Sequence, residues 1–436
     1  MRILITFLII FFYSFAKANS INVVRDAEIE NLLKDISKIL VRGTQLENDV
    51  LTFYLDNQKF INALVTPDKK FFFTTELLLK SKNVEDVAGV ISHEIGHVIG
   101  GHFQKRQKKM EKNSVINVLS SILAVGAIAG GAYNAGTAIL MGGQHLGTSR
   151  MLAFSRSQES LADQTAIRLL KRNGFSLQGL INIFSEIQRN EKLRKINPYF
   201  LTHPLSTERI RNIKINLENQ KIRKYERLND RFKLAKAKLN GFFLKKEQID
   251  YLYPKSINLD SLYAHALHNY RVGKIEAAMK YIDQCIKKDK KNPYFHELKG
   301  QMYYESGNFQ NAIKSFFISK SILPNEKGFA LFLAKSLYHS DVRGNQEKSI
   351  QLLLEYVKKD EFPIDAWHYL GLNYGKLKKL DYSSYSFAEK YILTGKIESA
   401  KIHIDRATKI TKDPVLKKKL LDLKYEMKKR KKWKKL

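Results

Sequence analysis

The chain has 436 residues, 44% of them hydrophobic and 27% charged, which is ample for a packed core and too long for one average domain. It carries 75 Lys and Arg against 43 Asp and Glu, a formal net charge of +32, but the lysines are spread along the whole sequence. We therefore expect a solvated basic surface rather than a nucleic-acid site. The single cysteine, Cys285, excludes a disulfide framework and a cysteine-based structural zinc site.

The first residues have the pattern of an export signal. Arg2 precedes an apolar run from Ile3 to Phe15, and a small-x-small cleavage site follows at 16–18. The run is shorter than the roughly 20 residues that a membrane span needs. We therefore expect residues 1–18 to be a cleaved signal peptide, with an uncleaved anchor helix as the alternative. Export to the bacterial periplasm argues against a nucleic-acid partner and leaves anionic lipid or acidic envelope proteins as partners for the positive charge.

In chain order, the first half of the sequence predicts a small sheet among helices. Ile21–Lys59 has the pattern of a helix followed by a strand, and Ile61–Phe73 that of two short strands around a turn at 66–69. Val84–Met110 has apolar residues along one helical face. Ser157–Arg172 predicts a second strong helix, which an Asn-Gly pair closes.

Three further segments are less regular. The Gly- and Ala-rich apolar block Val115–Met141 has three open interpretations: a core or site-covering segment, a membrane-touching hairpin, or a true membrane span. Thr202–Ser206 predicts a loop that leads into a long charged helix from Glu208 to about Lys238, which we expect to bridge to a second domain. The lysine-rich tail Lys417–Leu436 is expected to be a disordered, solvated end, with contact to anionic headgroups as the alternative.

The second half of the sequence repeats itself. Gly273 and Gly307 are 34 residues apart, and so are Ala278 and Ala312. This is the period of the tetratricopeptide repeat, in which each pair of helices buries its face against the next pair. We expect about four repeats within residues 255–415, with an ordinary helical bundle as the alternative.

The motif that carries chemistry is His-Glu-Ile-Gly-His at residues 93–97. Residues four apart lie one above the other on a helix, so His93 and His97 present their imidazoles to one point, with Glu94 beside them. This pair makes half of a catalytic zinc site, which needs three protein ligands and one position open for water. Two ordinary surface histidines are the alternative.

A third ligand has to come from elsewhere in the chain. The metzincin pattern needs a histidine where this sequence has Phe103; His102 stands one residue early, an error of about 100° around a helix. Glu159 and Asp163 are better candidates because they share one face of the second predicted helix. We expect Glu159 to bind zinc and Asp163 to hydrogen-bond a ligand histidine.

These motifs occur together with Thr-His-Pro-Leu-Ser-Thr-Glu-Arg at 202–209, a signal peptide and tetratricopeptide repeats. The combination resembles the periplasmic BepA (YfgC-type) zinc metallopeptidases, relatives of the HtpX and CaaX-processing Ste-type proteases. The resemblance covers nearly the whole mature chain. It implies one Zn²⁺ per chain held by His93, His97 and Glu159, with Glu94 as the base. It also implies that His203 can take the fourth zinc position and keep the enzyme latent.

The resemblance has local departures. The family usually has a Pro-Gly-Gly turn and a Thr-Gly pair upstream of the zinc helix, where this chain has Pro-Asp-Lys at 67–69 and Thr-Glu at 75–76. These changes concern the strand beside the site and leave every zinc position intact. We expect substrate to add as a strand along the edge formed by about Lys70–Thr74, with at least one face of Phe71–Phe73 in the core.

The expected fold is mainly α with a small β-sheet: an α+β HExxH zinc-peptidase domain followed by an all-α tetratricopeptide solenoid. The expected bounds are a signal peptide at 1–18, the peptidase domain at 19–225, a charged helical linker at 226–254, the repeats at 255–415 and a basic tail at 416–436.

The family implies a periplasmic zinc endopeptidase that degrades misfolded or stalled outer-membrane proteins and assists their assembly. Its partners would be those unfolded or assembling proteins and their assembly machinery, without nucleic acid, and with peripheral membrane contact left open. The alternative is a chaperone-like repeat scaffold whose peptidase site is latent.

Overall fold

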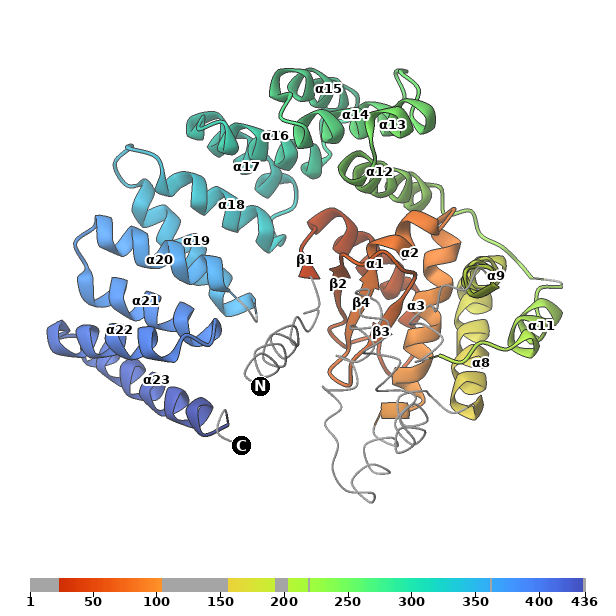
Figure 1. The fold of residues 1–436 in the computed structure, drawn as a ribbon, viewed down its shortest axis with the longest axis horizontal. Helices are drawn as coiled ribbons and strands as arrows, with labels where there is room; N and C mark the ends of the chain where they lie inside the picture. The colour runs from red at the N-terminus through yellow and green to blue at the C-terminus, as the bar shows by residue number, and fades with distance from the viewer. Residues whose placement is uncertain (1–22, 104–155, 193–202, 219, 361–362, 434–436) are drawn as a thin grey trace, which may run out of the picture. The chain divides into compact units, whose positions relative to one another are not determined.

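The structure, a computed structural model, describes residues 23–103, 156–192, 203–218, 220–360 and 363–433 (Figure 1). As expected, it is mainly α-helical with one small sheet. Its contacts divide the chain into two compact units, residues 1–243 and 244–436, and this division falls inside the predicted linker. The predicted signal peptide and the block Val115–Met141 lie outside the described residues. Among the described residues, no helix combines the length and apolar character needed to cross a bilayer.

The first unit contains a four-stranded sheet in the order β1-β2-β4-β3. Its strands are β1 (Val23–Val24), β2 (Thr52–Asp56), β3 (Ala63–Val65) and β4 (Lys70–Thr74). β2 and β4 are parallel, whereas the other two pairings are antiparallel. Alternate side chains face opposite sides of a strand. The inward row of β2, β3 and β4 is accordingly apolar and buried, and it includes Phe53, Leu55, Ala63, Val65, Phe71 and Phe73.

The expectation that about Lys70–Thr74 forms the substrate edge is wrong. β4 lies between two strands: Phe71 pairs with Phe53 of β2 on one side and with Val65 of β3 on the other. Its backbone groups are therefore already used on both sides. A strand whose Phe71 and Phe73 are fully buried occupies the interior of the sheet, and the short strands β1 and β3 form its edges. The edge that contacts helix α3 is β3.

Helices pack against this sheet and share one hydrophobic core with it. They are α1 (Ala27–Val41), α2 (Thr75–Lys80), α3 (Val84–Ile99), α8 (Arg156–Asn173), α9 (Gln178–Lys192), α11 (Thr207–Ile215) and α12 (Glu226–Phe243). The predicted helix and strand within Ile21–Lys59 are confirmed as α1 and β2, and the helix Ser157–Arg172 as α8. α8 ends at Asn173, and the next residue, Gly174, has a φ of 75°, the left-handed conformation that glycine adopts freely.

Two predicted helix bounds are wrong. The helix expected over Val84–Met110 ends at Ile99, because Gly100 caps it and Gly101 turns the chain with a φ of 61°. The single charged helix expected from Glu208 to about Lys238 is two helices, α11 and α12. α12 is no solvated bridge, since its apolar residues at helical spacing, including Leu228, Phe232, Ala235 and Leu239, join the core of the first unit.

Helix α3 packs unusually close to its neighbours because it carries glycines at the contacts. A Cβ atom at Gly96 would lie 2.6 Å from the carbonyl oxygen of Ala162 in α8, and one at Gly89 would lie 2.8 Å from the amide nitrogen of Leu180 in α9. Neither backbone can move away cheaply. These contacts set the distance between α3 and α8, the two helices that carry the predicted zinc ligands.

Gly96→Ala should therefore destabilise the first unit by about 1–3 kcal/mol, the usual cost of overpacking a core. Chemical denaturation followed by fluorescence and circular dichroism would measure this. Leu161→Ala is the matched control, because Leu161 neighbours Ala162 on α8 but is 49% exposed, and we expect it to change stability by less than about 0.5 kcal/mol. Equal stability of the Gly96→Ala variant and wild type would show that the two helices can separate freely.

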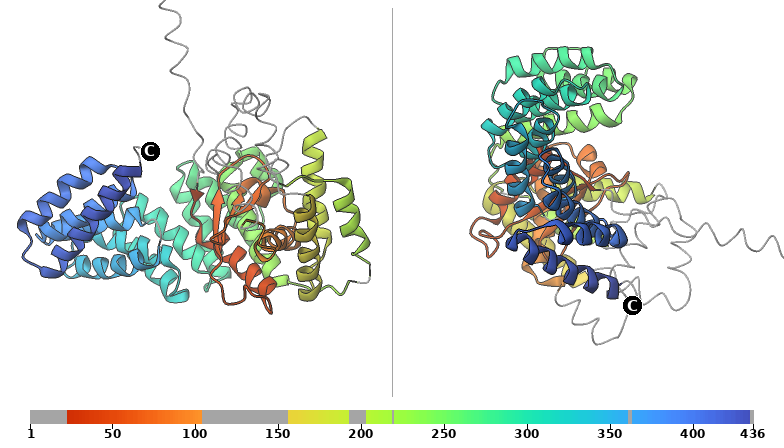
Figure 2. Two further views of the ribbon diagram at one scale, coloured as in Figure 1. Left: turned by 90° about the horizontal axis from the view of Figure 1, so that it is seen from below. Right: turned by 90° about the vertical axis from the view of Figure 1, so that its left-hand side faces the viewer.

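The second unit is a solenoid of helix pairs. Its helices are α13 (Lys246–Leu252), α14 (Leu259–Arg271), α15 (Ile275–Lys288), α16 (Pro293–Glu305), α17 (Phe309–Ile322), α18 (Lys327–Tyr338), α19 (Asn345–Lys359), α20 (Ile364–Lys376), α21 (Leu380–Leu393), α22 (Ile397–Ile410) and α23 (Pro414–Trp433). From α14 to α23, each helix packs against the next one along the chain, and Figures 1 and 2 show them side by side. This arrangement confirms the tetratricopeptide repeats that the 34-residue period predicted.

The repeated residues explain the pairing. Gly273 and Gly307 both have a φ of 77° in the turn between paired helices. Ala278 and Ala312 are fully buried on the second helix of their pairs. The small side chains let the backbones approach, as the sequence pattern indicated.

The expected disordered tail is instead a helix. Leu416, Leu420 and Leu423 recur at helical spacing and are buried, and with Ile404 of α22 they belong to one hydrophobic cluster. Residues up to Trp433 are helical. α23 therefore caps the end of the solenoid, while its other side carries the exposed lysines.

Residues 244–436 should fold without the first unit, because solenoid contacts join neighbours in sequence. We expect the isolated fragment to give a strongly helical circular dichroism spectrum and a cooperative thermal transition. A fragment without helical signal would show that the solenoid depends on the first unit.

Candidate metal centre

Four buried side chains of the first unit converge on one point: His93, His97, Glu159 and His203. The histidines 93 and 97 project from α3, Glu159 from the first turn of α8, and His203 from the loop before α11. One ligand atom from each lies within 4.8 Å of all the others. The structure thus brings together residues that are up to 110 positions apart in sequence.

Four separations between the ligand atoms are close to those around a zinc ion. The Nε2 atoms of His93 and His97 are 3.1 Å apart, and Nε2 of His97 lies 3.3 Å from Oε1 of Glu159. Nδ1 of His203 lies 3.3 Å from Nε2 of His93 and 3.2 Å from Oε1 of Glu159. Ligands about 2.05 Å from a tetrahedral zinc ion are separated by about 3.3 Å. Three imidazole nitrogens and one carboxylate oxygen are also ligand types that zinc binds.

The charges of the cluster are strongly coupled. Burial would raise the pKa of Glu159, but His203, His93 and His97 hold that pKa well below its usual range. Burial would also lower the pKa of His93, but Asp163 and Glu159 outweigh it and raise the pKa to about 9. Metal binding to this imidazole therefore competes with its protonation.

Glu94 lies beside the four ligand residues without being one of them. Its carboxylate is buried, and Oε1 lies 3.7 Å from Nε2 of His203. Burial raises the pKa of Glu94, which makes its carboxylate a stronger base than an exposed one. The placement and the environment are those expected for a general base.

Asp163 holds the far side of His93, as predicted from its spacing to Glu159. Its Oδ1 lies 2.9 Å from Nδ1 of His93, so this imidazole presents Nε2 to the cluster. Arg209 donates to both oxygens of Asp163, with distances of 2.6 and 2.8 Å. It also lies 2.7 Å from Oε2 of Glu159 and donates to the carbonyl of Pro204 at 3.0 Å.

Arg209 is the residue that the sequence reasoning missed. Its guanidinium contacts Glu159, the predicted third ligand, Asp163, which lies against His93, and the loop that carries His203. A sign was present in the sequence, because Arg209 lies in the same short motif as His203 and a buried arginine needs carboxylate partners.

Arg209→Met should destabilise the first unit by about 3–5 kcal/mol, because it leaves two buried carboxylates without their cation. It should also weaken metal binding. Arg211→Met is the control, since Arg211 lies on the same helix and is exposed. Thermal unfolding and metal titration of both variants would measure the difference. Equal stability and equal metal affinity of the two variants would show that Arg209 does not support the metal centre.

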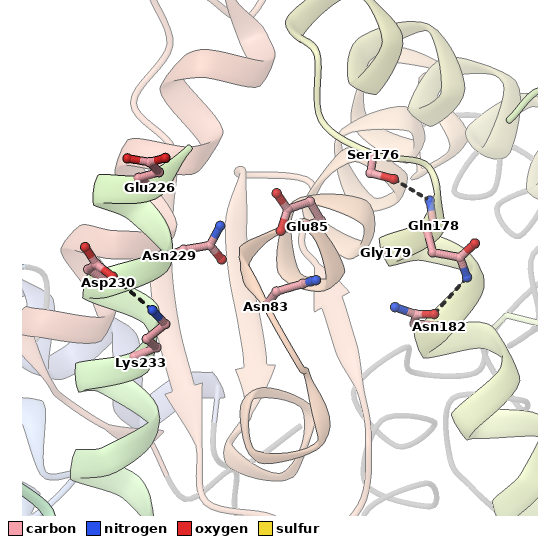
Figure 3. A pocket seen from close by; sticks show the side chains of 10 residues that line it. All are labelled: Asn83, Glu85, Ser176, Gln178, Gly179, Asn182, Glu226, Asn229, Asp230 and Lys233. Carbon is pink, nitrogen blue, oxygen red and sulfur yellow. Dashed lines mark hydrogen bonds and ion pairs between the residues drawn. The ribbon is translucent and has the colours of Figure 1, made fainter. Parts of the chain in front are cut away.

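The first unit also has a polar pocket of about 590 Å³ that shares no residue with the metal centre. It lies at the start of α3 and α9 beside α12, and Figure 3 shows Glu85, Asn182 and Lys233 among its lining residues. Several of its polar groups bond one another, as Gln178 does with Asn182 and Lys233 with Asp230.

Comparison with known proteins gives a consistent result. Residues 25–216 match the profile of peptidase family M48. The chain is 23% identical over 385 residues to the beta-barrel assembly-enhancing protease of Escherichia coli K12, covering 85% of this chain and 77% of that protein. Metalloprotease YcaL of E. coli K12 is 30% identical over 154 residues, 33% of this chain and 54% of that protein. Metalloprotease LoiP of E. coli K12 is 32% identical over 129 residues, 30% of this chain and 48% of that protein.

Proposed function

We propose a function from the premise that this protein is a metallopeptidase with a peptidase family M48 domain at residues 25–216. The proposed metal is zinc, and the proposed substrates are unfolded proteins in the periplasm. The observation that carries the proposal is the convergence of four buried ligand atoms within 4.8 Å of one another. His93, His97 and Glu159 are the three ligands that a catalytic site needs, and His203 stands at the fourth position.

The side chains divide the work of hydrolysis. A zinc ion held by His93, His97 and Glu159 would supply Lewis acidity, which acidifies water and polarises a carbonyl group. Glu94 takes a proton from the attacking water and later gives it to the leaving amine. Asp163 fixes the ring of His93, and Arg209 fixes Asp163 and Glu159. Because every member is buried, these groups act in a medium that strengthens each electrostatic contact.

Substrate is proposed to add to the edge strand β3, residues Ala63–Val65, instead of to β4. β3 is the edge that contacts α3, the helix with His93 and His97. Backbone pairing along an edge accepts many sequences. This suits an endopeptidase that recognises an extended, unfolded chain instead of one particular sequence.

The clients proposed for this protein are misfolded or stalled outer-membrane proteins, together with their assembly machinery. Support comes from the similarity to the beta-barrel assembly-enhancing protease of E. coli, from the predicted signal peptide, and from a helical-repeat unit of a type that offers a large surface to partners. Peripheral contact with a membrane surface is part of the same proposal, since the exposed side of α23 is rich in lysine.

A second function follows from the position of His203. With this imidazole in the fourth ligand position, the peptidase site is latent and the repeats can act as a chaperone-like scaffold for outer-membrane protein assembly. The two functions make opposite predictions for a single variant in cells. If Glu94→Gln abolishes both the maturation and the degradation of client proteins, proteolysis is the main role. If client proteins are still assembled, the main role is binding by the repeats.

The direct test uses the purified mature protein. Elemental analysis should find one zinc per chain, and an unfolded β-barrel protein should be cleaved by wild type but not after zinc removal by a chelator. Protein purified at neutral pH without zinc, and unable to take it up, would contradict the site assignment.

A further inference from the structure

We infer that His102 is a positioning residue that holds the metal ligand His97 by a histidine–histidine hydrogen bond. The inference deepens the proposed function and rests on it, since it concerns the same zinc site. His102 was rejected above as a zinc ligand because of its register. The structure assigns it a place behind the ligand instead of at the metal.

The end of α3 brings His102 into this place. The helix stops at Ile99, Gly100 keeps the αR conformation, and Gly101 reverses the chain with a φ of 61°. His102 is thereby returned to the helix it has just left, and its side chain is completely buried. Its Nδ1 lies 2.9 Å from Nδ1 of His97, with the two rings at 76° to each other.

The hydrogen bond has one consistent direction. His97 faces the ligand cluster with Nε2, which lies 3.1 Å from Nε2 of His93. A ligand imidazole that gives its Nε2 lone pair to a metal carries its proton on Nδ1. That N–H then donates to Nδ1 of His102, which accepts as a neutral ring.

The two zinc histidines are therefore supported by different chemistry. His93 has the carboxylate of Asp163 behind it, whereas His97 has a neutral imidazole. Arg209 already forms ion pairs with two carboxylates, those of Glu159 and Asp163. A third carboxylate behind His97 would add a buried negative charge to a cluster whose one arginine is already shared.

Gly100 is part of the same arrangement. A Cβ atom on this residue would lie 2.3 Å from Nε2 of His102 and 2.8 Å from two carbons of its ring. Since the backbone of Gly100 itself suits any residue, the glycine serves to leave room for the ring. Gly100→Ala thus offers a way to displace His102 without removing it.

The test compares zinc affinity among variants of the full mature protein. Competition with a chelator of known affinity gives the zinc dissociation constant, and the visible spectrum of the Co²⁺-substituted protein reports the ligand geometry. His102→Leu should weaken zinc binding about 10- to 100-fold and change the cobalt spectrum. His102→Asn should stay within about threefold of wild type, because its amide oxygen can accept the same hydrogen bond.

Gly100→Ala should resemble His102→Leu in direction, with a smaller effect, and it tests the inference should His102→Leu fail to fold. Ile99→Val is the control: this half-buried residue belongs to the same turn and packs on the core, and it should leave zinc affinity and spectrum unchanged.

Three results would contradict the inference alone: wild-type affinity in both His102→Leu and Gly100→Ala, an equal loss in His102→Asn and His102→Leu, or a cobalt spectrum that none of these substitutions alters. Failure of the wild-type protein to bind zinc would instead contradict the proposed function, and this inference with it.

Discussion

Alanine at His93, His97 or Glu159 should remove stoichiometric zinc from the purified protein, whereas Glu94→Gln should keep the metal and lose hydrolysis. The first three contribute converging ligand atoms, and without any one of them zinc would keep only the other two and the imidazole of His203, whose loop has to move away for activity. Glu94 contributes a base, so its amide variant should lower kcat about 10²- to 10⁴-fold. Elemental analysis and turnover of an unfolded substrate measure the two effects separately.

Glu85→Gln is the matched control for Glu94→Gln. Both residues belong to α3, but Glu85 lies in its first turn and lines the pocket of Figure 3, so zinc content and turnover should stay at wild-type levels. Stoichiometric zinc in Glu159→Ala would move the third ligand elsewhere. His203, whose Nδ1 lies 3.3 Å from Nε2 of His93, would then be the next candidate.

His203→Ala should increase turnover of an unfolded substrate, by about tenfold if the imidazole contributes about 1.4 kcal/mol to the closed state. Nδ1 of His203 lies within 3.3 Å of ligand atoms of both His93 and Glu159, where it fills the position that a catalytic site leaves open. Activity then requires the loop to move away. That loop is held by the hydrogen bond from Arg209 to the carbonyl of Pro204.

The measurement has to be made at matched zinc occupancy, because a lost ligand also lowers metal content. The alternative role for His203 is contact with the developing oxyanion, for which its removal would slow hydrolysis. A fall in turnover at equal zinc content would therefore reject latency and place His203 in the catalytic machinery.

Local periodicity in the sequence was enough to predict which residues share a helix face and that the second unit is built from repeats. The four-residue spacing of His93 and His97 predicted that they share a helix face, and the same rule paired Glu159 with Asp163. The 34-residue recurrence of glycine and alanine predicted the repeat unit, because each repeat needs small residues at the same positions of its helix pair. These features depend on residues close in sequence, or on a pattern that repeats.

Tertiary structure decided what depends on several segments at once. The interior place of β4 follows from strands on both sides of it, and no pattern within Lys70–Thr74 records which neighbours will pair. Arg209 acquires its role only when α8 and α11 meet. His102 looked misplaced because a continuous helix was assumed; two glycines end that helix and return the imidazole to His97. Sequence spacing therefore predicted His93, His97 and Glu159 as metal ligands, and the packing of distant segments determined what holds these side chains in place.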